Sequence, residues 1–114
     1  MSATPFQVRF SASARTGAFD QVHHLAKSLS HADAVARMSC VVDGVAVELQ
    51  KSPLVHPIVA ASAEFGITRY REIAMSGYRA GYLVDEERHE AVVVAIFRDG
   101  QDIRELLYRH LLTG

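Results

Sequence analysis

The sequence predicts an α+β domain: a small, mainly antiparallel sheet with two N-terminal helices packed on one face and a short C-terminal helix. Three observations predict it. Apolar residues recur at helical spacing through the first half of the chain, three strand-like runs follow one another in the second half, and the end returns to helical spacing. Two amphipathic helices that cover one face of a sheet make a two-layer α+β domain.

The length and composition fit a single domain that spans residues 1–114. The chain is 49% hydrophobic and 22% charged, which is a globular balance. A chain of this size buries roughly two thirds of the surface that it exposes when unfolded, which is enough for one core without disulfides. Its single cysteine, Cys40, has no partner for an intramolecular disulfide, and we expect it to be a buried small hydrophobe within a helix.

The chain is predicted to begin with a strand and a helix. The stretch FQVRF, residues 6–10, alternates apolar and polar side chains, which is typical of a strand. Ser13 is the predicted N-cap of a helix over 14–28. The apolar positions of this helix recur at spacings of 4, 3 and 4 and therefore share one face: Ala18, Val22, Leu25 and Leu29.

A second helix is predicted from Ser30, where SHAD is a variant of the capping box with Asp33 in place of Glu. Gly44 and the β-branched run around it favour a strand instead, but helical spacing outweighs this signal. Pro53 ends the helix because proline cannot continue it. The predicted apolar face consists of Val35, Met38, Val42, Val45 and Leu49.

The remaining chain predicts an irregular connection, three strands and a helix. Residues 54–66 form the connection, with a short turn of helix near 58–64. Strands follow over 67–75, 78–85 and 90–97, the first two joined by a tight turn at Ser76-Gly77. The run AVVVAIF has no polar alternation, so we expect the last strand to be central and buried on both faces. Residues 102–112 form the final helix.

Charge and hydropathy restrict the classes of function. The net charge is −1 and the isoelectric point about 6.6, whereas proteins that depend on many phosphate contacts are usually strongly basic. A near-neutral net charge is still compatible with a basic patch on one part of the surface. No apolar run reaches the roughly 18 residues that span a bilayer, and the first ten residues lack a signal-peptide pattern. We therefore expect a cytoplasmic protein without membrane contact.

The histidines do not predict a metal site. His23 and His24 are adjacent and point in different directions on a helix, and no histidine pair lies at i, i+4 with a carboxylate partner. No glycine-rich phosphate loop occurs either. We expect neither a metal nor a cofactor.

Several segments together resemble the RelE/ParE family of bacterial type II toxins. They are YREIAMSGYRAGYLVD, with the Tyr-Arg pair Tyr78-Arg79 and then Tyr82, the apolar strand VVVAIF, and the ending GQDIRELL. The resemblance extends from Phe6 to Leu112. It implies a toxin that a cognate antitoxin neutralises. RelE-like members cleave mRNA on the ribosome, whereas ParE-like members, the plasmid-stabilisation type, inhibit DNA gyrase.

The residues of a RelE-like nuclease are incomplete in this sequence. Arg79 matches the family's hairpin arginine, but the position of the second catalytic arginine falls on Gly100 or Gln101. Arg98 stands where a histidine is frequent, and Tyr108 could replace the C-terminal tyrosine. The resemblance therefore favours a ParE-like gyrase inhibitor. The alternatives are a ribosome-dependent nuclease that uses Arg79, Arg98 and Tyr108, and a binding module of the same fold that is not toxic.

The ParE-like interpretation assigns two surfaces. The target would be bound by one hairpin face, on which we expect Arg71 and Arg79 to lie together, and by the C-terminal segment. This target-binding set comprises Arg71, Tyr78, Arg79, Arg98, Arg104, Tyr108 and Arg109. The antitoxin-binding set comprises Val22, Leu25, Leu29, Val35 and Met38. A homodimer of the toxin is also possible.

The same side chains have a structural alternative. Surface arginines commonly pair with carboxylates, and Asp99, Asp102 and Glu105 offset the arginines of the C-terminal segment. Tyr78 and Tyr82 share one strand face and fit packing residues better than base-stacking platforms.

Overall fold

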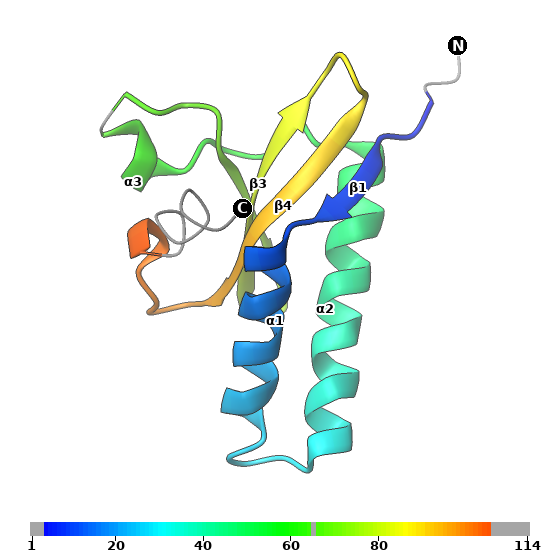
Figure 1. Cartoon of the computed structure of the whole chain (residues 1–114), viewed down its shortest axis with the longest axis vertical. Helices are drawn as coiled ribbons and strands as arrows, with labels where there is room; N and C mark the ends of the chain where they lie inside the picture. Colours follow the sequence, from blue (N-terminus) through cyan, green and yellow to red (C-terminus); the bar gives the residue numbers. More distant parts are fainter. Residues whose placement is uncertain (1–3, 65, 106–114) are drawn as a thin grey trace.

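The computed structural model describes residues 4–64 and 66–105 (Figure 1). The elements are β1 (Gln7–Phe10), α1 (Ala12–Leu25), α2 (His31–Lys51), α3 (Ala60–Ala63), β2 (Arg71–Met75), β3 (Tyr78–Asp85) and β4 (Glu90–Arg98). Residues 103–105 are also helical, and the rest of the predicted C-terminal helix lies outside the described residues. None of the described helices is long and apolar enough to cross a membrane.

The four strands form one sheet in the order β1-β4-β3-β2. The pairs β2–β3 and β3–β4 are antiparallel, while β1 runs parallel to β4. The helices α1 and α2 lie side by side and cover one face of this sheet (Figure 1). The predicted fold class is confirmed. The strand predicted over 67–75 is shorter than expected, since only Arg71–Met75 are paired.

The two helix caps show one prediction confirmed and one wrong. The side chain of Ser30 accepts a hydrogen bond from the backbone N–H of Asp33, 3.1 Å away, as the capping box predicts. The cap of α1 is Ser11 rather than Ser13. Ser11 Oγ accepts from the N–H of Ala14, whereas the Ser13 hydroxyl donates to the carbonyl of Val94 in β4 at 2.8 Å. The reason is that Ser13 already lies inside the helix, where it fastens α1 to the sheet.

The buried face of α2 is rotated relative to the prediction. Met38, Val45 and Leu49 are buried as expected, but Val35 is 40% exposed and Val42 only partly buried. Ala34 and Val41 are buried in their place. Val35 and Val42 lie on the side of α2 that borders a surface groove with α1, and this position leaves them partly open to solvent.

The last strand is the centre of the molecule. Every residue from Ala91 to Phe97 is buried, which confirms the prediction of a central strand covered on both faces. Gly81 opposes Ala95 while Tyr82 opposes Val93, so Val94 is an extra residue that forms a β-bulge. Val94 packs on the second face with Val59 and Ile103, which brings the α3 segment and the start of the C-terminal segment over that side (Figure 1).

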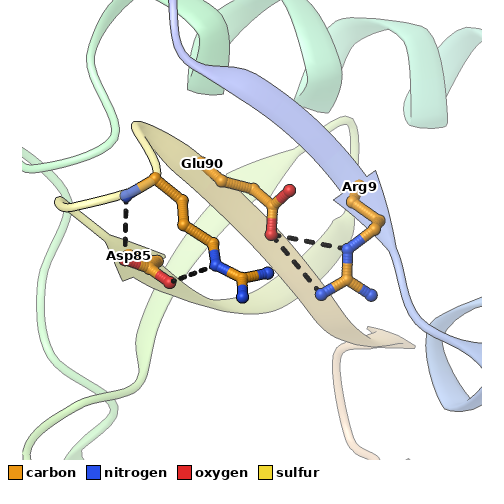
Figure 2. A network of polar contacts seen from close by, with 4 residues as sticks. Arg9, Asp85 and Glu90 are labelled. Atoms are coloured by element: carbon orange, nitrogen blue, oxygen red, sulfur yellow. Dashed lines mark hydrogen bonds and ion pairs between the residues drawn. The ribbon is translucent and has the colours of Figure 1, made fainter.

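Turns and ion pairs set the ends of the strands. Ser76 and Gly77 have φ values of 52° and 86°, so the predicted tight turn is a two-residue hairpin with both centres left-handed. At the other end of β3 the carboxylate of Asp85 accepts from the backbone of Arg88. Figure 2 shows how Glu90 of β4 accepts from Arg9 of β1, with both contacts at 3.4 Å. This pair reinforces the short parallel pairing of β1.

A buried hydrogen bond fastens the connection after α2 to the sheet. The Tyr82 hydroxyl donates to the carbonyl of Pro53, and the ring of His56 lies edge-on to the Tyr82 ring at 6.3 Å. The guanidinium of Arg71 donates to the His56 carbonyl at 2.6 Å. Burial raises the pKa of Tyr82 to about 12, because the charged phenolate is poorly solvated there.

Helix α1 crosses β4 with backbone in contact with backbone. A Cβ added at Gly17 would lie 2.6 Å from the carbonyl oxygen of Ile96. Only glycine therefore permits this separation of helix and strand.

Replacement of Gly17 by alanine is expected to lower the free energy of unfolding by about 1–3 kcal/mol, because the added methyl forces α1 away from β4. Alanine is the better helix former, so helix propensity alone would give the opposite sign. Urea unfolding of Gly17→Ala measures this, with Thr16→Ala as the exposed control on the same helix. A variant as stable as the wild type would contradict the close contact.

Replacement of Tyr82 by phenylalanine is expected to lower the free energy of unfolding by about 1–2 kcal/mol, because the Pro53 carbonyl loses its buried donor.

The wild type should also lose stability from pH 10 to 12, by up to about 2 kcal/mol, since only the unfolded tyrosine releases its proton there. The difference in unfolding free energy between wild type and Tyr82→Phe, followed against pH, isolates this effect. A difference that does not shrink above pH 10 would exclude it.

Candidate target-binding surface

A pocket lies where the β2–β3 turn and the end of β4 meet the two long helices. We call it the hairpin-end pocket, and its volume is about 650 Å³. Its polar lining comes from His24 of α1, Arg37 and Cys40 of α2, Arg98 and Asp99 at the end of β4, and the β2–β3 turn. Tyr78 and Arg98, two of the predicted target-binding residues, are partners across β3 and β4 and both line it.

Cys40 corrects a prediction, because it is exposed in this pocket rather than buried. It lies next to Val41, which is 3% exposed, so the boundary between core and surface runs between the two residues. Adjacent residues point roughly 100° apart on a helix, and an apolar run along the sequence does not show which of them faces the core.

A buried glutamine holds Arg98. Gln21 is 1% exposed, and its Oε1 accepts from the Arg98 guanidinium at 3.2 Å. Its Nε2 donates to the side-chain oxygen of Gln101 at 2.9 Å, and the same oxygen accepts from the Arg98 backbone N–H at 2.8 Å. The Arg98 side chain is thus oriented by a neutral partner, which leaves its positive charge uncompensated by that bond.

This charge acts on a neighbouring histidine. Arg98 is the main cause that holds the pKa of His24 below its ordinary value, followed by partial desolvation and then Lys27. This lowered pKa favours the neutral imidazole, which can donate or accept a hydrogen bond at the rim of the pocket.

Arg79 lies on the other face of the sheet. Its guanidinium pairs with Glu72 and with Asp99, each at 3.1 Å, and the side chain is 46% exposed. This double pairing agrees with the structural alternative for Arg79. Asp99 also lines the hairpin-end pocket. The ion pair between Arg79 and Asp99 therefore connects the two faces of the sheet at the rim of this pocket.

Arg71 and Arg79 do not share a face, so that prediction is wrong. Arg71 opposes Tyr82 and Arg79 opposes Ala74, and the alternation of a strand places these two pairs on opposite sides. Arg71 turns toward the helices, where it is partly buried against the His56 carbonyl. It fastens the connection after α2 and stands apart from the hairpin end.

A separate apolar groove lies between α1 and α2. Its volume is about 280 Å³, and three members of the predicted antitoxin-binding set line it: Val22, Val35 and Met38. Phe19, which the sequence analysis did not single out, is 73% exposed at its edge. Leu25 lines the hairpin-end pocket instead, and Leu29 is half-buried in the connection between the helices.

Comparison with known proteins gives matches only among solved structures, since no family model and no curated protein matches the chain. The ParDE toxin–antitoxin system of P. aeruginosa matches with a TM-score of 0.67 and 12% identity, over 84% of this chain and 98% of the other. The RelBE2 toxin–antitoxin complex of Mycobacterium tuberculosis matches with a TM-score of 0.60 and 20% identity, over 88% of this chain and 98% of the other. The isolated E. coli RelE toxin matches with a TM-score of 0.54 and 15% identity, over 91% of this chain and 97% of the other.

This chain has the RelE/ParE toxin fold. The structural matches extend over most of it, as the resemblance from Phe6 to Leu112 predicted. At such identities the matches show the fold, while the chemistry must be judged from the side chains of this chain.

Three predicted target-binding residues of this RelE/ParE fold gather at the hairpin end: Tyr78, Arg79 and Arg98. Arg104 is exposed and pairs with Asp102 at 3.2 Å, and hydrogen bonds from Arg104 lower the pKa of that carboxyl. Tyr108 and Arg109 lie outside the described residues. Tyr78 is 9% exposed and Tyr82 fully buried, so both pack on the helix face, as the structural alternative predicted.

Among the residues that the structure describes, the partners of Arg79 are carboxylates rather than the acid–base groups of a nuclease, and Tyr108 lies outside the described residues. Gln101, at the place expected for a second arginine, bonds to Gln21 and Arg98 instead. Within residues 4–64 and 66–105, no group of three or more His, Cys, Asp or Glu side chains is arranged to hold a metal ion.

Sequence reasoning missed Gln21, His24 and Arg37. Spacing pointed to another face of α1, because the predicted stripe was Ala18, Val22, Leu25 and Leu29, whereas the structure buries Ser13, Ala14, Gly17 and Gln21. A polar residue on a buried stripe needs a hydrogen-bonding partner, and Arg98 supplies it. No local signal connects Arg37 with the end of β4.

Proposed function

We propose that this protein is the toxin of a type II toxin–antitoxin system, that a cognate antitoxin neutralises it, and that it inhibits DNA gyrase by direct binding. The observation that carries the proposal is the RelE/ParE fold, which the chain shares with the toxin–antitoxin assemblies ParDE and RelBE2 along most of its length. The exposed apolar groove between α1 and α2 and the hairpin-end surface supply two separate places for two partners.

The groove suits an amphipathic helix of the antitoxin. Phe19 and Val35 are 73% and 40% exposed, and together with Val22 and Met38 they line a concave apolar strip. Burial of such side chains against a partner stabilises a complex by removing apolar surface from water. An exposed apolar patch of this kind on a small protein marks an interaction site.

Gyrase is the proposed target because the arginines of the hairpin suit protein recognition better than phosphodiester cleavage. Arg79 is neutralised by Glu72 and Asp99, so it contributes little net charge toward a phosphorane-like transition state. The net charge of −1 also gives no broad attraction to RNA. Tyr78, Arg79, Arg98 and Arg104 are the described members of the proposed gyrase-binding set, and Tyr108 and Arg109 stay predicted members outside the described residues.

Gyrase inhibition is tested with relaxed plasmid, ATP and purified toxin, by following supercoiling and the accumulation of cleaved plasmid. The wild type should inhibit, and Arg79→Ala should inhibit at least about tenfold less, as expected for an arginine in a binding surface. Arg88→Ala is the matched control, because Arg88 is an exposed arginine, paired with Asp85, in the β3–β4 turn at the opposite end of β3 from Arg79.

Each other result of this assay points elsewhere. If excess toxin leaves gyrase active, the gyrase proposal fails, and cleavage of mRNA on translating ribosomes then tests the RelE-like alternative. Normal growth of cells that express the protein without antitoxin would instead favour a binding module that is not toxic.

Replacement of Val35 by glutamate is expected to weaken antitoxin binding at least about tenfold, because a charge would be placed against an apolar helix face. Growth arrest without antitoxin should persist. Val47→Glu is the control, since Val47 is 49% exposed on α2 and is not part of the groove lining. Co-purification with the antitoxin and growth rescue measure both effects. Equal loss in the two variants would show that the groove is not the antitoxin site.

A further inference from the structure

The hairpin-end pocket has features that a protein–protein contact does not require. We propose that it binds a nucleoside monophosphate group, free or at the 5′ end of a strand, with the phosphate held by Arg37 and Arg98. The base or sugar would lie against the partly exposed side chain of Leu25, beneath which Val41 and Tyr78 are buried. This proposal does not depend on gyrase as the target.

Two guanidinium groups line the pocket without a carboxylate bound to either. Arg98 is bonded to the neutral side chain of Gln21, and Arg37 has no hydrogen bond or ion pair with any residue in the described part of the chain. Among the described residues of the lining, Asp99 is the one carboxylate, and its Oδ1 accepts from Arg79. The planar donor groups of two arginines match the several oxygens of a phosphate dianion.

The Arg98 side of the site is in place before any ligand arrives. Gln21 is 1% exposed and is itself held by Gln101, so the Arg98 guanidinium is oriented by a buried network rather than by solvent. A charged group that is already in position loses less conformational entropy on binding than a free surface arginine.

His24 is the third polar group of the site. The positive charges of Arg98 and Lys27 lower its pKa, with Arg37 and Asp99 as the other charged groups in the pocket lining. A neutral imidazole can donate to a phosphate oxygen. A bound phosphate would oppose the effect of Arg98 and raise the pKa of His24.

The dimensions favour a nucleotide over a bare anion. A volume of about 650 Å³ falls within the range of roughly 300–1,000 Å³ typical of small-molecule sites. The apolar side chains in the lining have no use in holding inorganic phosphate, but they can pack against a base.

The test titrates the full-length protein with AMP and follows backbone amide signals and the His24 ring signals by NMR. AMP should bind saturably, with the pKa of His24 raised in the complex, and adenosine without phosphate should not bind. Arg37→Gln should weaken AMP binding at least about tenfold, because a charge-assisted hydrogen bond is lost. The matched control is Arg15→Gln, an exposed arginine near the start of α1 that is not in the lining.

A dinucleotide with a 5′ phosphate then identifies the source of the phosphate group. If it binds more tightly than AMP and Arg37→Gln abolishes that binding, the ligand is the end of a strand. If it binds equally or more weakly than AMP, the ligand is a free nucleotide. Failure of both ligands to saturate the protein would overturn the proposal, and so would equal effects of Arg37→Gln and Arg15→Gln. Inorganic phosphate that binds as tightly as AMP would overturn the nucleotide assignment. Because Arg37 is exposed, its loss should leave the fold intact, which circular dichroism checks.

Discussion

The close contact between α1 and β4 is the constraint on which the rest of the structure depends. Gly17 allows the helix backbone to lie against the Ile96 carbonyl, and the Ser13 hydroxyl fixes the start of the same helix to Val94. Since β4 pairs with both β1 and β3, this contact sets the position of the helix layer on the whole sheet. One turn beyond Gly17, it also brings Gln21 to the end of β4, where Gln21 orients Arg98. A packing requirement in the core thereby places a polar group in the proposed site.

The partners of the arginines distinguish their roles better than their positions in the sequence do. Arg71 donates to a backbone carbonyl and fastens a connection, and Arg79 is balanced by two carboxylates at the rim of the sheet. Arg98 is held by a neutral amide and keeps its charge. An exposed ion pair contributes little to stability, whereas an oriented arginine without a carboxylate is available to an anionic ligand. Arg98 and Arg37 therefore bring two positive charges to the hairpin-end pocket, in a chain whose net charge is −1.

The two proposed interaction sites involve different sides of the same pair of helices. The groove of Phe19, Val22, Val35 and Met38 is apolar, and the hairpin-end pocket combines arginine with apolar side chains. An antitoxin helix in the groove would leave the pocket free unless a further segment of the antitoxin reached across Arg37. Neutralisation could then arise either by steric exclusion of the target or by direct occupation of the pocket, and the two sites can be altered independently because their linings share no residue.

For the residues that the structure describes, the sequence by itself determined the order of the helices and strands and the central place of β4. Helical spacing, the Ser30 cap, the Ser76-Gly77 turn and the unbroken apolar run from Ala91 to Phe97 are local signals, and the structure confirms each of them. The two-residue turn also fixes the register that places Arg71 and Arg79 on opposite faces. Only the tertiary structure decided which stripe of α2 is buried, that Cys40 is exposed, and that Gln21 holds Arg98. The physical reason is that these outcomes depend on side chains that meet across the fold, 77 positions apart in the case of Gln21 and Arg98, where local spacing carries no information.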